Sequence, residues 1–228
     1  MVLNNASEAL CRRLAYHFHD PALLTRALTH RSKGGDHNER LEFLGDSVLN
    51  LVISAELYDR FPHLDEGDLT RLRASLVRKP TLAAHARTLE IGQCIELGGG
   101  ELKSGGYDRD SLLADTLEAI LGAIFKDKGL GEATRVIHLL YQNSFTQLDP
   151  TTIPKDPKTR LQEYLQKHSL PTPSYNILDV MGEAHHQNFV IECRVVGLSE
   201  AVRGEGNSRR AAEQQAAERA LALIEPST

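Results

Sequence analysis

The 228-residue chain has no tryptophan, two methionines and only three cysteines. Cys11, Cys94 and Cys193 are odd in number and far apart, so they match neither a disulfide framework nor a zinc site. We expect them to be small buried hydrophobic residues in a reducing compartment. No apolar run reaches the roughly 18 residues of a transmembrane helix, and residues 1–19 lack the apolar core of a signal peptide. The sequence therefore predicts a cytoplasmic protein without membrane association.

An excess of basic residues is also missing. The formal net charge is -5, with 17 basic and 21 acidic residues in 1–154 and 9 and 10 in 155–228. Proteins that bind nucleic acid are often basic. Any binding to RNA or DNA must therefore depend on local placement of Lys and Arg rather than on the field of the whole chain.

Residues 1–148 are predicted to be almost entirely helical, because apolar residues recur with helical spacing and alternating β-branched runs are absent. We expect loops at 30–37, 61–68 and 98–110. The stretch 147–157 contains three prolines and no periodicity, which is typical of a linker.

The pattern changes after this stretch. Alternation of apolar and polar residues predicts half-buried strands, and an Ala-rich segment with Asn207 or Ser208 as its N-cap predicts a final helix. The expected elements are a helix at 159–168, strands at 175–181, 189–196 and 200–203, and a helix at 208–224. A second domain with the order α-β-β-β-α follows.

Two predicted helices contain acidic residues although most of their other residues are apolar. Ten of 17 residues in 41–57 and ten of 14 in 112–125 are apolar and lie on all sides, which is typical of buried helices. Glu39, Glu42 and Asp46 nevertheless form one stripe at i, i+3 and i+7, and Asp115 and Glu118 form another at i and i+3.

Buried carboxylates need compensation, because each unpaired one costs several kcal/mol. Protonation, a bound cation or the nearby Arg40, Arg71 and Arg73 would provide it, and exposed acids in ion pairs are the alternative. Residues 112–125 contain no Lys or Arg. An oxygen-only cluster suits Mg²⁺ or Mn²⁺ rather than Zn²⁺, and Mg²⁺ held by carboxylates supports phosphodiester hydrolysis.

The run 37–49, HNERLEFLGDSVL, resembles the signature of the ribonuclease III family. Four further runs match in order: THRS at 29–32, DEGD at 65–68, GELKSGG at 100–106 and ADTLEA at 114–119. The resemblance implies a helical endonuclease and dimerisation domain, residues 1–148, acting as a homodimer. It also implies Mg²⁺-dependent cleavage of double-stranded RNA, with Mn²⁺ as a substitute, to 5′-phosphate and 3′-hydroxyl ends with short 3′ overhangs. Expected substrates are ribosomal RNA precursors and some messenger and transfer RNAs.

The resemblance also implies roles for single residues. Glu42, Asp115 and Glu118 correspond to metal ligands, and Asp46 and Glu118 to catalytic acids. Glu39 and Glu66 match accessory acids that contact the substrate or the subunit interface.

Residues 156–226, joined by a linker at 149–155, resemble a double-stranded-RNA-binding domain. Such domains read 2′-hydroxyls and phosphates of the A-form helix, and a helix N-terminus favours phosphate. Glu213 stands where the family often has Lys, which predicts weaker attraction to phosphate. The expected RNA-binding residues are Thr159, Gln162, Gln166, His185, His186, Ser208, Arg209 and Arg210.

The predicted fold class is thus α followed by α+β. One alternative function is a non-catalytic double-stranded-RNA-binding dimer, and another is a metal-dependent phosphohydrolase of small molecules. The glycine-rich segment 98–104 is no phosphate-binding loop, because Leu102 precedes Lys103 where such a loop needs Gly. We expect no organic cofactor.

Overall fold

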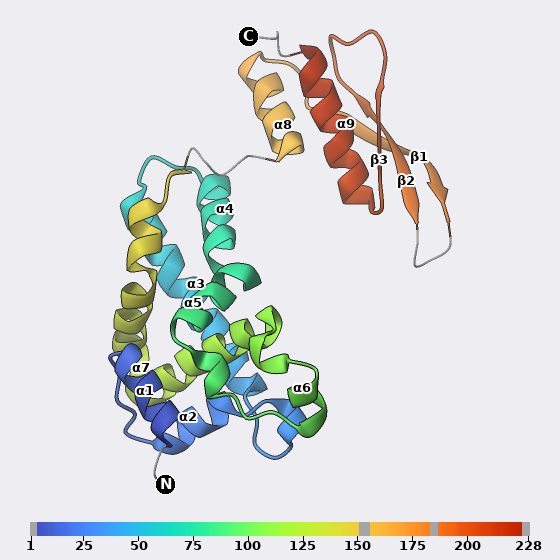
Figure 1. The fold of residues 1–228 in the computed structure, drawn as a ribbon. Coiled ribbons are helices and arrows are strands. Elements are labelled where there is room, and N and C mark those ends of the chain that lie inside the picture. The colour runs from blue at the N-terminus through green and yellow to red at the C-terminus, as the bar shows by residue number, and fades with distance from the viewer. Residues whose placement is uncertain (1–3, 151–155, 183–186, 225–228) are drawn as a thin grey trace. The chain divides into compact units, whose positions relative to one another are not determined.

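A computed structural model describes residues 4–150, 156–182 and 187–224. The chain divides into two compact units, 1–153 and 154–228, and the predicted fold class is confirmed for both (Figure 1). The first unit holds α1 (Asn5–Arg13), α2 (Pro21–Leu28), α3 (Glu39–Arg60), α4 (Glu66–Val77), α5 (Lys79–Thr88), α6 (Gly99–Lys103), α7 (Asp110–Gln147) and the 3₁₀ helices η1 (Arg31–Lys33), η2 (Ile91–Gln93) and η3 (Gly106–Asp108). The second holds α8 (Pro157–Lys167), β1 (Ser174–Met181), β2 (Asn188–Arg194), β3 (Val202–Gly206) and α9 (Arg209–Ile224).

Side-chain caps fix the starts of several helices in the first unit. Asn4 accepts a hydrogen bond from the Ser7 amide at 2.8 Å, and Asp65 accepts one from the Asp68 amide at 2.7 Å. These bonds satisfy amides that have no partner inside the helix. Pro80 at the start of α5 has the backbone angle that a first turn requires.

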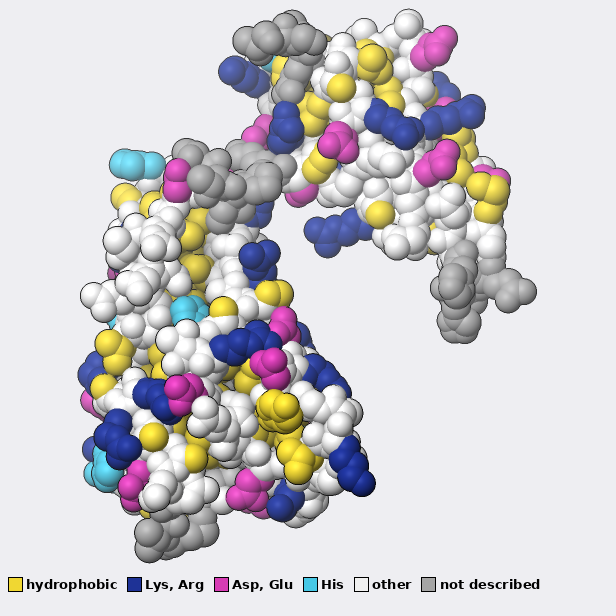
Figure 2. Space-filling view, viewed as in Figure 1, with side chains coloured by type: hydrophobic (Ala, Val, Ile, Leu, Met, Phe, Trp, Pro, Cys, Tyr) yellow, Lys and Arg dark blue, Asp and Glu magenta, His cyan; other side chains and the backbone are white. Residues whose placement is uncertain are grey.

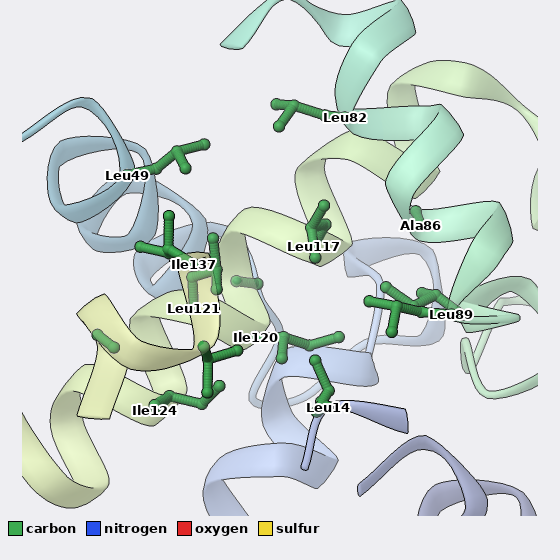
Figure 3. Close-up of a cluster of buried hydrophobic side chains, with 14 of the residues drawn as sticks. Leu14, Leu49, Leu82, Ala86, Leu89, Leu117, Ile120, Leu121, Ile124 and Ile137 are labelled. Carbon is green, nitrogen blue, oxygen red and sulfur yellow. The ribbon is translucent and has the colours of Figure 1, made fainter. Parts of the chain in front are cut away.

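The core of the helical unit is built around α7. Its segment 112–125 is buried on nearly all sides, as predicted. Figure 3 shows Leu49 of α3 and Leu82 of α5 in one cluster with the α7 side chains Leu117 and Leu121. The two acids of this segment therefore sit on a helix that is fixed by the core.

The helices α3 and α7 meet backbone to backbone at two glycines. A β-carbon at Gly45 would lie 1.7 Å from the Glu118 carbonyl oxygen, and one at Gly122 would lie 2.2 Å from the Leu41 carbonyl oxygen. No larger residue fits this crossing. Because Gly45 lies between Glu42 and Asp46, and Gly122 one turn beyond Glu118, the crossing brings both acid stripes together.

The expectation that segment 41–57 is buried all round was wrong. Phe43 and Leu51 are 77% and 55% exposed, and Tyr58 in the next turn is 71% exposed. Only one side of α3 packs on the core, through residues such as Val48, Leu49 and Ile53. An apolar helix surface without a cover in one chain is typical of a contact with another molecule.

Several boundaries also differ from those expected, and the expected loop 61–68 already contains the first turn of α4. The segment 98–110 forms α6 and η3, and 30–37 contains η1, so neither is a plain loop. The third strand is Val202–Gly206 rather than 200–203, because Val202 pairs with Cys193 and Gly206 with Phe189. Ser208 caps α9 through a hydrogen bond from the Ala211 amide at 3.2 Å, which confirms one of the two predicted caps.

The second unit is an antiparallel sheet with the order β1-β2-β3, covered by helices. The helix α9 packs on β2 and β3, and α8 packs on α9 (Figure 1). A β-carbon at Gly204 would lie 2.3 Å from the Ala212 carbonyl oxygen. This approach explains why α9 is rich in Ala.

All three cysteines are free and buried, as expected. Among the described residues, no helix combines the length and apolar character needed to cross a membrane. The cytoplasmic location stays a prediction.

The glycine crossing generates the first prediction. Gly122→Ala should lower the free energy of unfolding by about 2–4 kcal/mol, because the added methyl group forces two backbones apart. Urea denaturation followed by circular dichroism measures this. Gly131→Ala, just beyond the kink of α7 at Gly129, is the control, since a β-carbon added there would contact nothing outside its own stretch of helix. Equal stability of the two variants would show that the crossing tolerates a side chain.

Candidate active site

The two acid stripes line one cavity of about 580 Å³ in the helical unit. Glu39, Glu42 and Asp46 enter it from α3, and Asp115 and Glu118 from α7. The remaining lining residues are His30, Arg31, Asn38, Phe43, Glu101, Arg109, Ser111 and Leu112.

Glu42, Asp115 and Glu118 come closest to one another. Each offers a carboxylate oxygen, and these three oxygens all lie within 4.8 Å of one another. All three side chains are half-buried. An octahedral Mg²⁺ with ligands at about 2.1 Å needs oxygens about 3 to 4.2 Å apart, so small rotations of these side chains would bring the three carboxylates around one ion. The residues present thus fit a hard divalent cation.

The electrostatics of the cluster are strained without a cation. Burial, followed by the charges of Asp46, Asp115 and Glu42, raises the pKa of Glu118 to about 8. Burial, followed by the charge of Asp115, also raises the pKa of Glu42. A protonated Glu118 is therefore one way in which the metal-free site relieves repulsion near neutral pH.

None of the three arginines that the sequence offered as compensating cations pairs with an acid of the cluster. Arg71 pairs with Asp68, Arg73 donates to the Ser54 hydroxyl at 3.0 Å, and Arg40 is exposed. Instead, Lys79 Nζ lies 3.1 Å from Asp115 Oδ1. The sequence pattern did not single out Lys79, which lies 36 positions before its partner.

The other predicted acids lie at different distances from this cluster. Asp46 is exposed at the cavity and accepts a hydrogen bond from Asn50 Nδ2 at 2.8 Å. Glu39 pairs with Arg31 at 3.1 Å. Glu66 begins α4, accepts from the Thr70 hydroxyl at 3.1 Å and does not line the cavity. Within one chain the structure therefore leaves Glu66 apart from the cluster.

The predicted RNA-binding residues fall into two groups in the second unit. Gln162 and Gln166 are exposed on α8, whereas the Thr159 hydroxyl is occupied by Asp156 at 2.9 Å as part of the helix cap. Ser208, Arg209 and Arg210 are exposed at the start of α9. A cavity brings Thr159 and Gln162 beside Arg210. His185 and His186 lie outside the described residues.

Glu213 has a structural position that the sequence did not indicate. It is 8% exposed and accepts from Lys158 Nζ at 2.6 Å and from Arg209 Nε at 2.9 Å. Burial alone would raise the pKa of Glu213, but hydrogen bonds from Lys158 and Arg209 outweigh burial and hold it below the usual value. Glu213 therefore links α8 to α9. Its carboxylate also neutralises the positive charges of Lys158 and Arg209 at the expected RNA surface.

Both units of the chain match known protein families. Residues 20–144 match the family model described as ribonuclease-III-like, and residues 157–224 match the double-stranded RNA binding motif. The chain belongs to the ribonuclease III family. It is thus a member of a family of endoribonucleases, as the sequence resemblance implied.

Relatives of this ribonuclease III family member match over nearly its whole length. A protein named Ribonuclease 3 from Photorhabdus laumondii is 56% identical over 216 residues, 95% of this chain and 96% of the relative. A second, from Pasteurella multocida, is 53% identical over 96% of this chain and 97% of the relative. The crystal structure of the ribonuclease III nuclease domain from Campylobacter jejuni is 42% identical, with a TM-score of 0.61, and covers 64% of this chain and 100% of that one.

The surface of this family member carries mixed charge. On the viewed face of each unit, Lys and Arg side chains lie among Asp and Glu side chains (Figure 2). This distribution agrees with the net charge of -5. Attraction to phosphate therefore has to come from local placement of basic residues rather than from the field of the whole chain.

The raised pKa of Glu118 predicts a pH-dependent stability. A folded-state pKa of about 8 against an ordinary value of 4.5 means that the folded chain keeps a proton that the unfolded chain releases. Stability should therefore fall as pH rises from about 4.5 to about 8 in the absence of metal. Glu118→Gln removes this loss, so its stability relative to the wild type should grow by on the order of 2 kcal/mol between pH 5 and pH 8.

Thermal unfolding in a chelator, repeated across this pH range, measures the effect. Saturating Mg²⁺ is the control condition, because a bound cation offsets the same repulsion. A difference between the two proteins that stays constant with pH in the chelator would show that Glu118 is ionised throughout.

Glu213 gives a second prediction. Glu213→Gln should lower the stability of the second unit by about 1–2 kcal/mol, because Lys158 loses a charged partner in a half-buried place. The same change should raise the affinity for duplex RNA, since Lys158 and Arg209 become available to phosphate. Glu218→Gln, on the exposed side of the same helix, controls for the loss of one negative charge. Unchanged affinity together with lost stability would restrict Glu213 to a structural role.

Proposed function

We propose that the protein is a Mg²⁺-dependent endonuclease that hydrolyses double-stranded RNA. The observation that carries the proposal is the convergence of Glu42, Asp115 and Glu118 to within 4.8 Å, in a chain that also contains a double-stranded RNA binding motif. Mn²⁺ is the expected substitute, since it shares the preference for oxygen ligands.

In this proposal Glu42, Asp115 and Glu118 hold the metal. When bound, Mg²⁺ neutralises charge at the scissile phosphate and lowers the pKa of water. Asp46 and Glu118 are the proposed catalytic acids. Asn50 holds Asp46 Oδ1, and among the described residues Asp46 Oδ2 has no hydrogen-bond partner, so Oδ2 is free to accept a proton from the attacking water. Attack at phosphorus with departure of the 3′ oxygen leaves a 5′-phosphate and a 3′-hydroxyl.

We assign residues 1–148 to nuclease and dimerisation functions, 149–155 to the linker and 156–226 to RNA binding. The two family matches and the division of the structure near residue 153 support these boundaries. Exposed Gln162, Gln166 and Arg210 are suited to 2′-hydroxyls and phosphates. Ser208 and Arg209 at the same helix terminus belong to this surface.

A homodimer is the proposed assembly. The uncovered apolar side of α3, with Phe43, Leu51 and Tyr58, supports it, because such a surface is stable in water when a second copy covers it. A second structure of the Campylobacter jejuni nuclease domain is described as flexible in a region involved in dimer formation. Short 3′ overhangs follow if each subunit cuts one strand. Glu39 and Glu66 are proposed to contact the substrate or the partner.

The substrates we propose are ribosomal RNA precursors and some messenger and transfer RNAs, in line with the family. A non-catalytic RNA-binding dimer would have no need for three converging carboxylates. A phosphohydrolase of small molecules would have no need for the second unit. Both alternatives are therefore less well supported.

One cleavage assay tests the proposed function. Long duplex RNA is incubated with the wild type in Mg²⁺ or in a chelator, and with Glu118→Gln in Mg²⁺. We expect wild-type cleavage in Mg²⁺ alone, and a kcat at least about a hundredfold lower for Glu118→Gln with nearly unchanged duplex affinity, because the variant keeps its shape but loses a charged ligand. Duplex binding without any cleavage by the wild type would favour the non-catalytic alternative.

A further inference from the structure

Lys79 occupies an unusual position for a lysine. It is the first residue of α5, where the helix dipole presents partial positive charge. A cation there lowers the stability of the helix unless a carboxylate faces it. Asp115 is that carboxylate, with Oδ1 3.1 Å from Lys79 Nζ.

The partner of Lys79 belongs to the acid cluster. Six acids line the cavity, and four of them, Glu42, Asp46, Asp115 and Glu118, form one group, because the charges of the first three act on Glu118. Among the described residues, the Lys79–Asp115 salt bridge is the one that ends on any of these four; Arg31 and Arg109 pair with Glu39 and Glu101 at the rim. Among the described residues, Lys79 is therefore the one cation in a salt bridge with this group of four, and the charge of Arg31 acts on Glu42 without a salt bridge.

The accessibility of this pair allows exchange. The Lys79 side chain is 63% exposed and that of Asp115 is 29% exposed. Lys79 can withdraw into water on its flexible stem, whereas Asp115 is held by the buried segment of α7. A divalent cation on the Asp115 carboxylate and an ammonium 3.1 Å from Oδ1 would repel each other.

We propose that Lys79 is a positioning residue that acts as the resident cation of the acid cluster. It holds Asp115 in the metal-free enzyme and gives up this carboxylate when the divalent cation binds. Lys79 thereby stabilises the empty cluster and raises the metal concentration needed to fill it. The inference rests on the proposed function only in taking Asp115 as a metal ligand.

Lys79→Met tests the proposal without RNA. Protein freed of metal by a chelator is titrated with Mn²⁺ alone by calorimetry, and its melting temperature is measured with and without Mn²⁺. We expect Mn²⁺ to bind about threefold to tenfold more tightly to Lys79→Met, because one competing positive charge is gone. We also expect the metal-free melting temperature to fall by about 2–5 °C, with saturating Mn²⁺ closing the gap.

The sign of the stability change separates this proposal from a simple helix-dipole effect. Removing a cation from a helix N-terminus would raise the melting temperature if no carboxylate depended on it. Lys79→Arg keeps the charge and should restore the metal-free stability. Lys128→Met, an exposed lysine of α7 outside the cavity, controls for the loss of net charge and should leave Mn²⁺ affinity unchanged.

A double-mutant cycle completes the test. In an Asp115→Asn background, Lys79→Met should no longer lower the metal-free melting temperature. An equal loss in both backgrounds, or Mn²⁺ affinity in Lys79→Met that is unchanged or weaker, would overturn the proposal. These results are independent of RNA cleavage, so an inactive wild type would count against the proposed function and not against the role of Lys79.

Discussion

The crossing of α3 and α7 is the contact on which the rest of the helical unit depends. Gly45 and Gly122 allow the two backbones to approach to a distance at which any β-carbon would overlap a carbonyl oxygen. On one side of this crossing α7 is fixed by the apolar core, and on the other Glu42 and Glu118 enter the same cavity. Close packing thus determines where charge is concentrated, because the acids lie within a turn or so of the glycines on both helices.

Repulsion among these carboxylates lowers the free energy of unfolding, and the structure offsets this repulsion in two ways. Glu118 retains a proton at neutral pH because its pKa is raised to about 8, and Lys79 supplies one ammonium to Asp115. In the proposed function, both the proton and the ammonium would give way to a divalent cation, whose two charges would relieve more of the repulsion. Sites that hold strained charge for function while lowering stability are common in enzymes. The second unit contains a comparable case, since the buried Glu213 is paired with both Lys158 and Arg209.

Local patterns predicted most of the fold, because helical and strand periodicity record burial directly. They also placed five of the six acids that line the cavity, since stripes at i, i+3 and i+7 are a property of one helix. Patterns within one helix did not reveal Lys79, which reaches Asp115 across 36 positions and two elements. The same limit explains the error on α3: an apolar side chain such as Phe43 has the same pattern whether the core or another molecule covers it. Glu213 was judged by its charge, whereas its burial and partners come from the packing of α8 on α9.

We propose that the crossing at Gly45 and Gly122 assembles Glu42, Asp115 and Glu118 into one site for a divalent cation. Crystals of the protein soaked in Mn²⁺, with diffraction recorded at a wavelength where manganese scatters anomalously, test it most directly. We expect an anomalous difference peak in contact with carboxylate oxygens of all three residues. The absence of a peak there at saturating Mn²⁺, or a peak only at other acids such as Glu39 or Glu66, would contradict it.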